Sequence, residues 1–154
     1  MPTRSTTDHA EAADPVLLFL RTVWQLEHAL ERASKRMENA MGISGPQWFA
    51  LRIIGARPAI TAGELAAALH LHPSTVTGIV QRLEARKLVK RVSNSNDGRI
   101  AHLHLTPAGS KINKPGTKGT IERAACTTLA SAAGPQLKAT AALMGQFTEQ
   151  LMKI

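Results

Sequence analysis

The sequence has no tyrosine, a single cysteine (Cys126), three phenylalanines and two tryptophans. One cysteine excludes a framework of internal disulfides, so we expect a reducing compartment, the cytoplasm. With so few aromatic side chains, the core must consist mainly of leucine, isoleucine, valine, alanine and methionine.

Long apolar runs are also missing. No stretch reaches the roughly 18–20 consecutive apolar residues that a bilayer-spanning helix needs. Residues 1–13 are polar and have no apolar segment behind a basic start, so we expect a flexible arm rather than a signal peptide. The sequence therefore predicts no segment embedded in a membrane.

Negative charge is scarce relative to positive charge. Lys and Arg number 19 against 11 Asp and Glu, which gives a net charge of +8 over 154 residues. Such a balance favours polyanions as partners, either nucleic acid or an anionic membrane surface. The length is that of one domain, or of one domain with an appended oligomerisation element.

Four helices are predicted in the first part of the chain. Asp14-Pro15 is typical of a helix start, and apolar residues then recur every three or four positions up to residue 41. Capping-box patterns begin helices over 44–56 and 61–69, and Pro73 begins another over 73–86.

After residue 86 the hydrophobic period changes to that of β-strands. The β-prone segment 88–92 precedes a dense turn signal, and residues 99–105 alternate between apolar and polar side chains. Leu103 and Leu105 would share one face, with His102 and His104 on the other. This pattern predicts a two-stranded hairpin.

The rest of the chain is predicted to be helical. Thr106-Pro107 is typical of a helix start, and the sequence predicts helices over 107–132 and 135–152. Lys114-Pro115-Gly116 should kink or interrupt the first of them, because proline lacks a backbone N–H.

The helices 61–69 and 73–86, joined by a tight turn, form a helix-turn-helix pattern. One face of the second helix would pack on the first through Val76, Ile79, Val80 and Leu83. Its other face, rich in small hydroxyl residues, and its N-terminal turn would suit a DNA major groove and its phosphates. A basic hairpin that follows directly would be the wing of a winged helix.

Two segments resemble the MarR family of transcriptional regulators: ELAAALHLHPSTVTGIVQRLEARKLVKR (64–91) and NDGRIAHLHLTPAG (96–109). The wing of that family reads Asp-x-Arg, followed by Leu-Thr and a helix start that contains glycine. Asp97-Gly98-Arg99 and residues 105–109 match this pattern. The resemblance implies that Arg99 reaches into the minor groove and that Asp97 holds it there.

The resemblance implies a mainly α fold, a winged helix-turn-helix with a small β-hairpin wing and a helical dimerisation domain. Residues 43–106 would form the DNA-binding domain, and 14–42 with 107–154 the dimerisation region. The implied function is that of an obligate homodimer that binds an inverted-repeat operator in double-stranded DNA. It would act as a repressor released by a small aromatic or phenolic effector, with no cofactor, no metal and no membrane partner.

The candidate DNA contacts fall into three groups. Base edges and nearby phosphates would face His72, Ser74, Thr75, Thr77, Gly78 and Gln81. Phosphates further along the duplex would meet Arg82, Arg86, Lys90 and Arg91. The wing would add Asp97 and Arg99.

Two positions depart from the family pattern. His70 stands where the turn usually carries glycine, and this position often requires a positive φ, which histidine tolerates better than most residues. Residues 115–119, which contain one proline and two glycines, should weaken the fifth helix.

Other functions stay open at this stage. An effector pocket could involve Trp24, His28 and Trp48, although such residues are more often ordinary core or boundary residues. Cys126 could be a redox sensor, but its small apolar neighbours on the helix indicate a buried structural residue. A winged helix can also bind protein or RNA instead of duplex DNA.

Enzymatic and metal sites are weakly supported. Ser74, His72 and Asp97 are the residue types of a hydrolase, but no nucleophile elbow or phosphate loop accompanies them, so we expect no enzyme. The pairs His70/His72 and His102/His104 have no carboxylate or thiol placed nearby in sequence, so we expect no zinc site.

Overall fold

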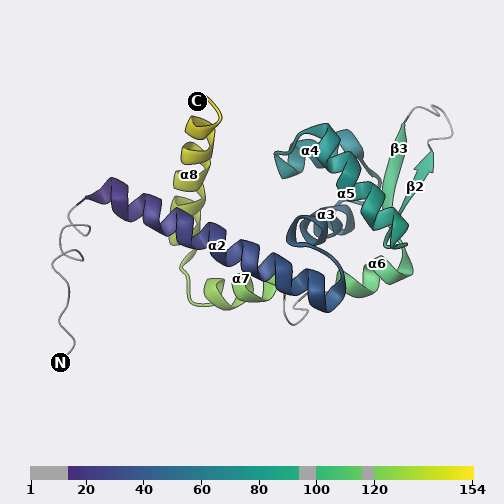
Figure 1. Cartoon of the computed structure of the whole chain (residues 1–154), viewed down its shortest axis with the longest axis horizontal. Helices are drawn as coiled ribbons and strands as arrows, with labels where there is room; N and C mark the ends of the chain where they lie inside the picture. The colour runs from purple at the N-terminus through teal and green to yellow at the C-terminus, as the bar shows by residue number, and fades with distance from the viewer. Residues whose placement is uncertain (1–13, 94–99, 116–119) are drawn as a thin grey trace. The chain divides into compact units, whose positions relative to one another are not determined.

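The computed structural model describes residues 14–93, 100–115 and 120–154 (Figure 1). The helices are α2 (Pro15–Met41), α3 (Gly45–Ala56), α4 (Ala62–Leu69), α5 (Pro73–Ala85), α6 (Pro107–Ile112), α7 (Ile121–Leu129) and α8 (Gly134–Leu151). The strands are β1 (Ile60–Thr61), β2 (Val89–Ser93) and β3 (Ala101–Leu105). The described residues form two compact units, one up to Lys114 and one from Pro115 on. None of the described helices is long and apolar enough to cross a membrane.

The predicted helix starts are confirmed by their capping hydrogen bonds. The Asp14 carboxylate accepts the N–H groups of Val16 and Leu17 at 2.8 and 3.3 Å, which satisfies donors that the first turn of α2 leaves unpaired. Ser44 and Gln47 form a capping box at α3, and Thr61 and Glu64 form one at α4.

The capping box of α4 also sets the charge state of its acid. The N–H and hydroxyl of Thr61 donate to Glu64 Oε2 at 2.7 and 2.8 Å. These hydrogen bonds favour the carboxylate and hold the pKa of Glu64 below its usual value. Because the folded pKa is lowered, the stabilising contribution is present at neutral pH and is lost as the pH falls through the folded pKa.

The sheet has three antiparallel strands in the order β1-β3-β2, so β3 is central. Val89 lies opposite Leu105, Arg91 opposite Leu103, and Ile60 opposite Leu103 from the other side. The sequence predicted only the hairpin of β2 and β3. β1 was missed because a two-residue strand is too short to show an alternating pattern.

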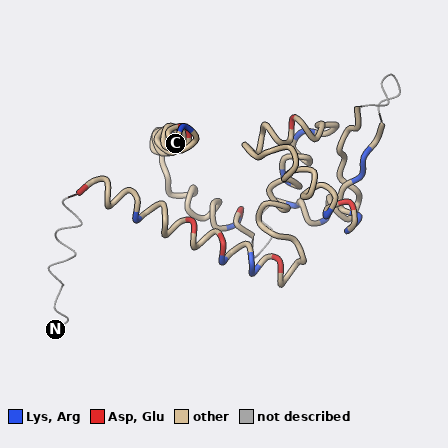
Figure 2. The backbone as a smooth tube through the Cα atoms, turned by 45° about the horizontal axis from the view of Figure 1, so that its top comes forward, with Lys and Arg blue, Asp and Glu red and all other residues tan. Residues whose placement is uncertain are grey.

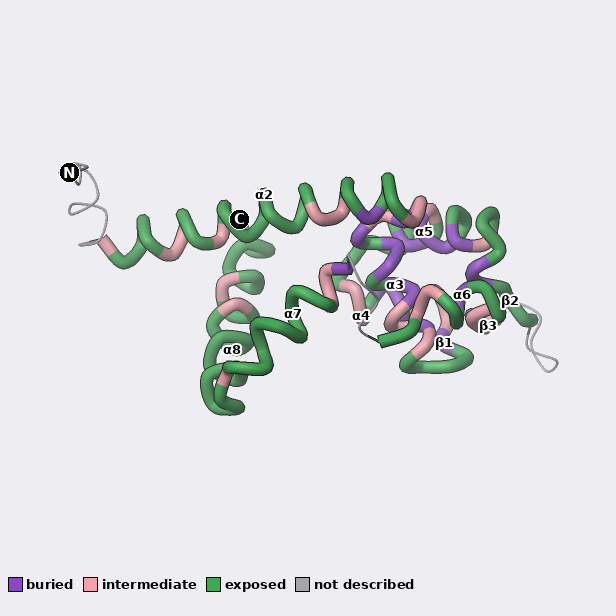
Figure 3. The backbone as a smooth tube through the Cα atoms, turned by 90° about the horizontal axis from the view of Figure 1, so that it is seen from below, coloured by how far each residue is buried: buried purple, intermediate pink, exposed green. Residues whose placement is uncertain are grey.

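The core belongs to the winged-helix part of the first unit. The largest fully buried side chains are Met37, Ile43, Leu51, Ile54, Leu65, Val76, Val80, Leu83 and Leu103. The four apolar positions predicted to form the buried face of α5 are therefore confirmed, since Ile79 is also only 4% exposed. In Figure 3 the buried segments concentrate in α3, α5 and the neighbouring elements, while most of α2 is exposed.

The helix predicted over 107–132 is interrupted, as expected from Lys114-Pro115-Gly116, and the structure has two shorter helices in this range. α6 ends at Ile112 and α7 begins at Ile121. Asn113 ends α6, and its backbone carbonyl and side-chain oxygen accept hydrogen bonds from Arg52 Nη1 at 2.7 and 3.0 Å. Arg52 thus fixes the end of α6 to α3, immediately before the predicted break at Lys114-Pro115.

The remaining helices leave many apolar side chains in water. Among the described residues of α7 and α8, none is buried. Large exposed apolar residues in this unit are Leu129, Leu137, Leu143, Leu151, Met152 and Ile154. α2 adds Val16, Leu17, Leu18, Trp24, Leu26 and Leu30. Within each unit these apolar side chains are therefore not covered by the unit's own core.

Candidate nucleic-acid interface

The N-terminus of α5 is organised by two of the predicted DNA contacts. His72 precedes the helix, and its Nδ1 accepts the Ser74 N–H at 3.3 Å and lies 2.7 Å from the Ser74 hydroxyl oxygen. Thr77 donates its hydroxyl to the Pro73 carbonyl at 2.9 Å. These hydrogen bonds hold short polar side chains close to the helix, which leaves space for another molecule along this face.

The exposed face of α5 is open to another molecule. Thr75, Thr77 and Gln81 are exposed, and no described atom lies within 4 Å of the place where a Cβ on Gly78 would stand. The face lies opposite the buried side chains Val76, Val80 and Leu83. The structure thus brings the sequence-predicted readout residues together on one open helix face.

The turn between α4 and α5 has the backbone conformation that was predicted at His70. His70 has φ +52°, its N–H donates to the Ala67 carbonyl at 3.2 Å, and the Leu71 N–H donates to the Ala66 carbonyl at 3.1 Å. This is a Schellman motif with histidine in place of the usual glycine.

Replacing His70 by glycine should therefore stabilise the domain. A β-carbon in the left-handed region is unfavourable, so we expect His70→Gly to raise the free energy of unfolding by about 0.5–1 kcal/mol. The measurement is the midpoint of urea unfolding, with His104→Gly, in a strand of ordinary backbone conformation, as a control that should lose stability. A lower midpoint for His70→Gly would show that the imidazole has a stabilising contact.

The base of the wing is joined to the turn that follows α5. Thr106 donates its hydroxyl to the Lys87 carbonyl at 2.6 Å and accepts the Gly109 N–H at 3.0 Å. Gly109 packs so closely on the Leu88 carbonyl that a Cβ would overlap it. The Leu-Thr-Pro-Ala-Gly segment therefore ties the end of β3 to the end of α5, a role that the sequence did not reveal.

Two of the four cations predicted to meet phosphates have partners inside the chain. Arg91 Nε lies 3.1 Å from Glu84 Oε2, and Arg86 Nη2 donates to the Met41 carbonyl at 3.1 Å. Arg82 and Lys90 are exposed, the first on α5 and the second on β2. Figure 2 shows basic residues along β2 and near the end of α5. Asp97 and Arg99 lie outside the described residues, so their wing roles stay predictions.

Comparison with known proteins finds a family whose model matches part of the chain. Residues 41–100, which include the capped helices, α5 and β2, match the model of the MarR family. This segment is therefore of the MarR-family type. The chain is 30% identical over 83 residues to the uncharacterised HTH-type transcriptional regulator YsmB of Bacillus subtilis, covering 54% of this chain and 57% of YsmB. It is 36% identical over 89 residues to the HTH-type transcriptional regulator FarR of Neisseria gonorrhoeae, covering 57% of this chain and 60% of FarR. The matches thus span less than two thirds of these relatives.

Solved structures confirm the winged-helix fold of this chain. The S. aureus MepR–DNA complex is similar with a TM-score of 0.69 at 20% identity, covering 86% of this chain and 97% of that one. The PcaV regulator from Streptomyces coelicolor, solved with its natural ligand, gives a TM-score of 0.66 at 22% identity, covering 97% and 98%. At these identities the likeness shows the fold alone.

The three residues proposed for a MarR-type effector pocket have different environments. Trp48 is 6% exposed in the core on α3, whereas Trp24 is 58% exposed on α2. His28 is exposed one turn further along α2, with Nδ1 2.8 Å from the Trp24 carbonyl. Trp24 and His28 are thus neighbours, while Trp48 is a core residue.

The structure also shows the environments of Cys126 and His102, the remaining candidate functional residues. Cys126 is exposed on α7, so the sequence-based expectation of a buried cysteine was wrong. The expectation failed because the small neighbours of Cys126 belong to a helix that has no buried face in one chain. His102 Nδ1 lies 2.7 Å from the Ala59 carbonyl and holds the turn before β1. The described residues contain no group of three His, Cys, Asp or Glu side chains that could hold a metal ion.

Proposed function

We propose that this chain is a homodimeric, sequence-specific DNA-binding regulator of transcription of the MarR family, acting in the cytoplasm as a repressor. The observation that carries the proposal is the open polar face of α5, which lies opposite a fully buried apolar face and beside a basic strand. The names of YsmB and FarR as HTH-type regulators and the MepR–DNA complex support it.

In this proposal the exposed face of α5 enters the major groove. The hydroxyls of Ser74, Thr75 and Thr77 approach phosphates and base edges, Gly78 permits close approach, and Gln81 reads a base. The partial positive charge of the helix dipole at the start of α5 favours a phosphate there. Arg82 and Lys90 are the cations best exposed to meet further phosphates.

Dimerisation is proposed to use residues 14–42 and 107–154, with 43–106 as the DNA-binding domain. The apolar residues that one copy leaves exposed on α2 and α8 support this division. A dimer with two-fold symmetry should bind an inverted repeat, with recognition helices in successive major grooves.

The function is tested by isolating genomic DNA fragments that the purified chain retains. We expect an inverted repeat with half-site centres about 10–10.5 base pairs apart, and an affinity that falls steeply with salt. Gln81→Ala should change the preferred base at one position of each half-site. Retention of RNA or protein instead of duplex DNA would contradict the proposal, and an unchanged base preference would contradict the assigned readout face.

The wing is expected to contribute through Arg99. Arg99 is predicted to lie in the minor groove, where narrow A·T segments concentrate negative potential. Arg99→Ala should therefore weaken DNA binding by about 1–3 kcal/mol per subunit. Asp97→Ala should have a smaller effect, because it releases the arginine without removing it. The measurements are operator affinity and melting temperature. If the variants keep the melting temperature of the parent, a lower affinity reports a lost DNA contact and not a lost fold. If Arg99→Ala binds the operator with the affinity of the parent, the wing has no role in binding.

A small aromatic or phenolic effector is proposed to release the repressor. Trp24 and His28 present an aromatic ring and an imidazole on adjacent turns of α2, which suits a small aromatic anion. Trp48, being buried, would contribute only as the floor of such a site. Calorimetric titration of Trp24→Ala and His28→Ala with phenolic acids tests this assignment.

A further inference from the structure

Arg86, at the C-terminal end of α5, contacts the C-terminal end of α2. Its Nη2 donates to the Met41 carbonyl at 3.1 Å. Its guanidinium also covers Gly42 so closely that a Cβ there would overlap Nη1 and Nη2. Gly42 has φ +68°, and its N–H donates to the Glu38 carbonyl at 2.7 Å, which closes the helix.

The C-terminal end of α2 has no cation of its own to stabilise its unpaired carbonyl groups. The last turn of α2, all of which is described, contains no basic residue and carries Glu38. The unpaired carbonyls at a helix C-terminus have a partial negative charge, so a guanidinium is stabilising there. Arg86 supplies this charge from the recognition helix, and it cannot be deprotonated in a protein.

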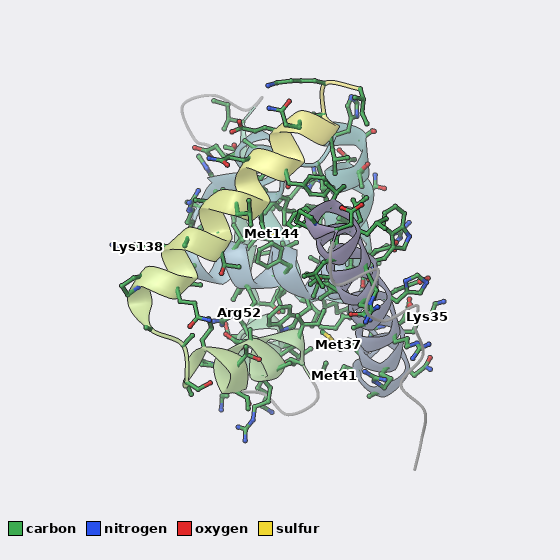
Figure 4. The ribbon with its side chains drawn as sticks, turned by 90° about the vertical axis from the view of Figure 1, so that its left-hand side faces the viewer. Lys35, Met37, Met41, Arg52, Lys138 and Met144 are labelled. Atoms are coloured by element: carbon green, nitrogen blue, oxygen red, sulfur yellow. The ribbon has the colours of Figure 1, made fainter. Side chains whose placement is uncertain are left out.

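The last two turns of α2 are otherwise fixed to the winged-helix core. Met37 is 1% exposed and Ile43 is fully buried. The Gly45 N–H donates to the Ser34 hydroxyl oxygen at 2.8 Å. Figure 4 shows Met37 and Met41 on one side of α2 and Lys35 on the other. Arg86 adds a direct hydrogen bond between α5 and this anchored end.

We propose that Arg86 is a positioning residue, which holds α5 at a set angle to α2 and thereby sets the operator spacing that the dimer accepts. The inference rests on the proposed function of a dimer that binds an inverted repeat. α5 has 13 residues and is therefore about 20 Å long. A rotation of roughly 10° at its Arg86 end would move its N-terminus by about 3.5 Å, close to the rise of one base pair.

This role differs measurably from the phosphate contact that the sequence predicted for Arg86. A phosphate contact releases a counterion on binding. Its loss therefore reduces the slope of log affinity against log salt concentration by about one per subunit and weakens binding to all duplexes alike. A positioning contact acts through geometry. Its loss leaves the salt dependence unchanged and reduces discrimination between operators of different spacing.

The experiment compares Arg86→Ala and Gly42→Ala with the parent on the selected operator and on operators lengthened or shortened by one base pair. We expect the parent to prefer its own spacing by about tenfold, equivalent to about 1.4 kcal/mol, and both variants to lose most of this preference. Lys90→Ala is the control: it should lower the salt dependence and keep the preference. The double variant Gly42→Ala/Arg86→Ala should have the same spacing preference as Arg86→Ala, because both changes remove one contact, while alanine at φ +68° should lower only the stability further.

A measurement without DNA separates this inference from the proposed function. The Gly42 N–H should exchange with solvent several times faster in Arg86→Ala than in the parent, because the last turn of α2 loses its cation. Unchanged exchange, or a lowered salt dependence with intact spacing preference, would overturn the inference. A parent chain that binds no duplex DNA would overturn the proposed function, while hydrogen exchange would still decide whether Arg86 holds α2.

Discussion

A chain that ends at Lys114 should stay folded but become monomeric and lose about 10²–10⁴-fold in operator affinity, because each half-site is then bound without the avidity of a dimer. The first unit keeps its buried core and the Arg52–Asn113 hydrogen bonds in this variant. The removed unit carries the exposed apolar residues of α8, which are proposed to pair with a second copy. The measurements are sedimentation velocity and operator affinity.

The cut must follow Lys114 rather than Thr106. Ending the chain at Thr106 would also remove Gly109 and Asn113, which pack on the wing base and on α3, and so would unfold the first unit. The full-length variant Leu137→Glu/Leu151→Glu tests the same interface by charge. Lys138→Glu is its matched control, since Figure 4 shows Lys138 on a different side of α8 from Met144. A dimer that survives truncation would show that residues 115–154 are not needed for dimerisation and would contradict their proposed part in the interface.

Gly109→Val should destabilise the winged-helix unit by at least about 3 kcal/mol, at the upper end of the range for overpacking a core. The added side chain would overlap the Leu88 carbonyl, a backbone atom that cannot rotate away. Relief requires α6 to move from the sheet, which breaks the Thr106 hydroxyl bond to the Lys87 carbonyl. The measurement is the free energy of unfolding in urea.

The control for this change is the neighbouring Ala108→Val. Ala108 is exposed on the same helix, so valine should cost only about 0.5 kcal/mol through its lower helix propensity. Gly109→Val should also weaken operator binding, because the wing base and the end of α5 share this joint. Equal stability of the two variants would show that α6 is not held against Leu88.

The sequence predicted the local elements well, because their signals lie within a few neighbouring residues. The capping boxes at Ser44 and Thr61 and the left-handed His70 depend on contacts within one helix or turn, and the apolar spacing of α5 can be read within one helix. The family resemblance was readable for the same reason, since it rests on two continuous segments. The open face of α5 was predicted because it lies on the opposite side of the helix from the apolar positions.

Only the tertiary structure decided contacts between residues far apart in the chain. Arg86 is bound to Met41 across 45 residues, and Arg52 to Asn113 across 61. A side chain as long as arginine can reach several partners, and its own sequence neighbourhood does not select among them. In the sequence Gly109 is only a glycine near a helix start, whereas in the structure it packs against the Leu88 carbonyl. The sequence by itself determined the helices before residue 86, the two hairpin strands and the apolar face of α5, whereas β1 and the bounds of α6 and α7 came from the structure. The packing of distant segments decided which arginines are engaged within the chain and where the wing is anchored.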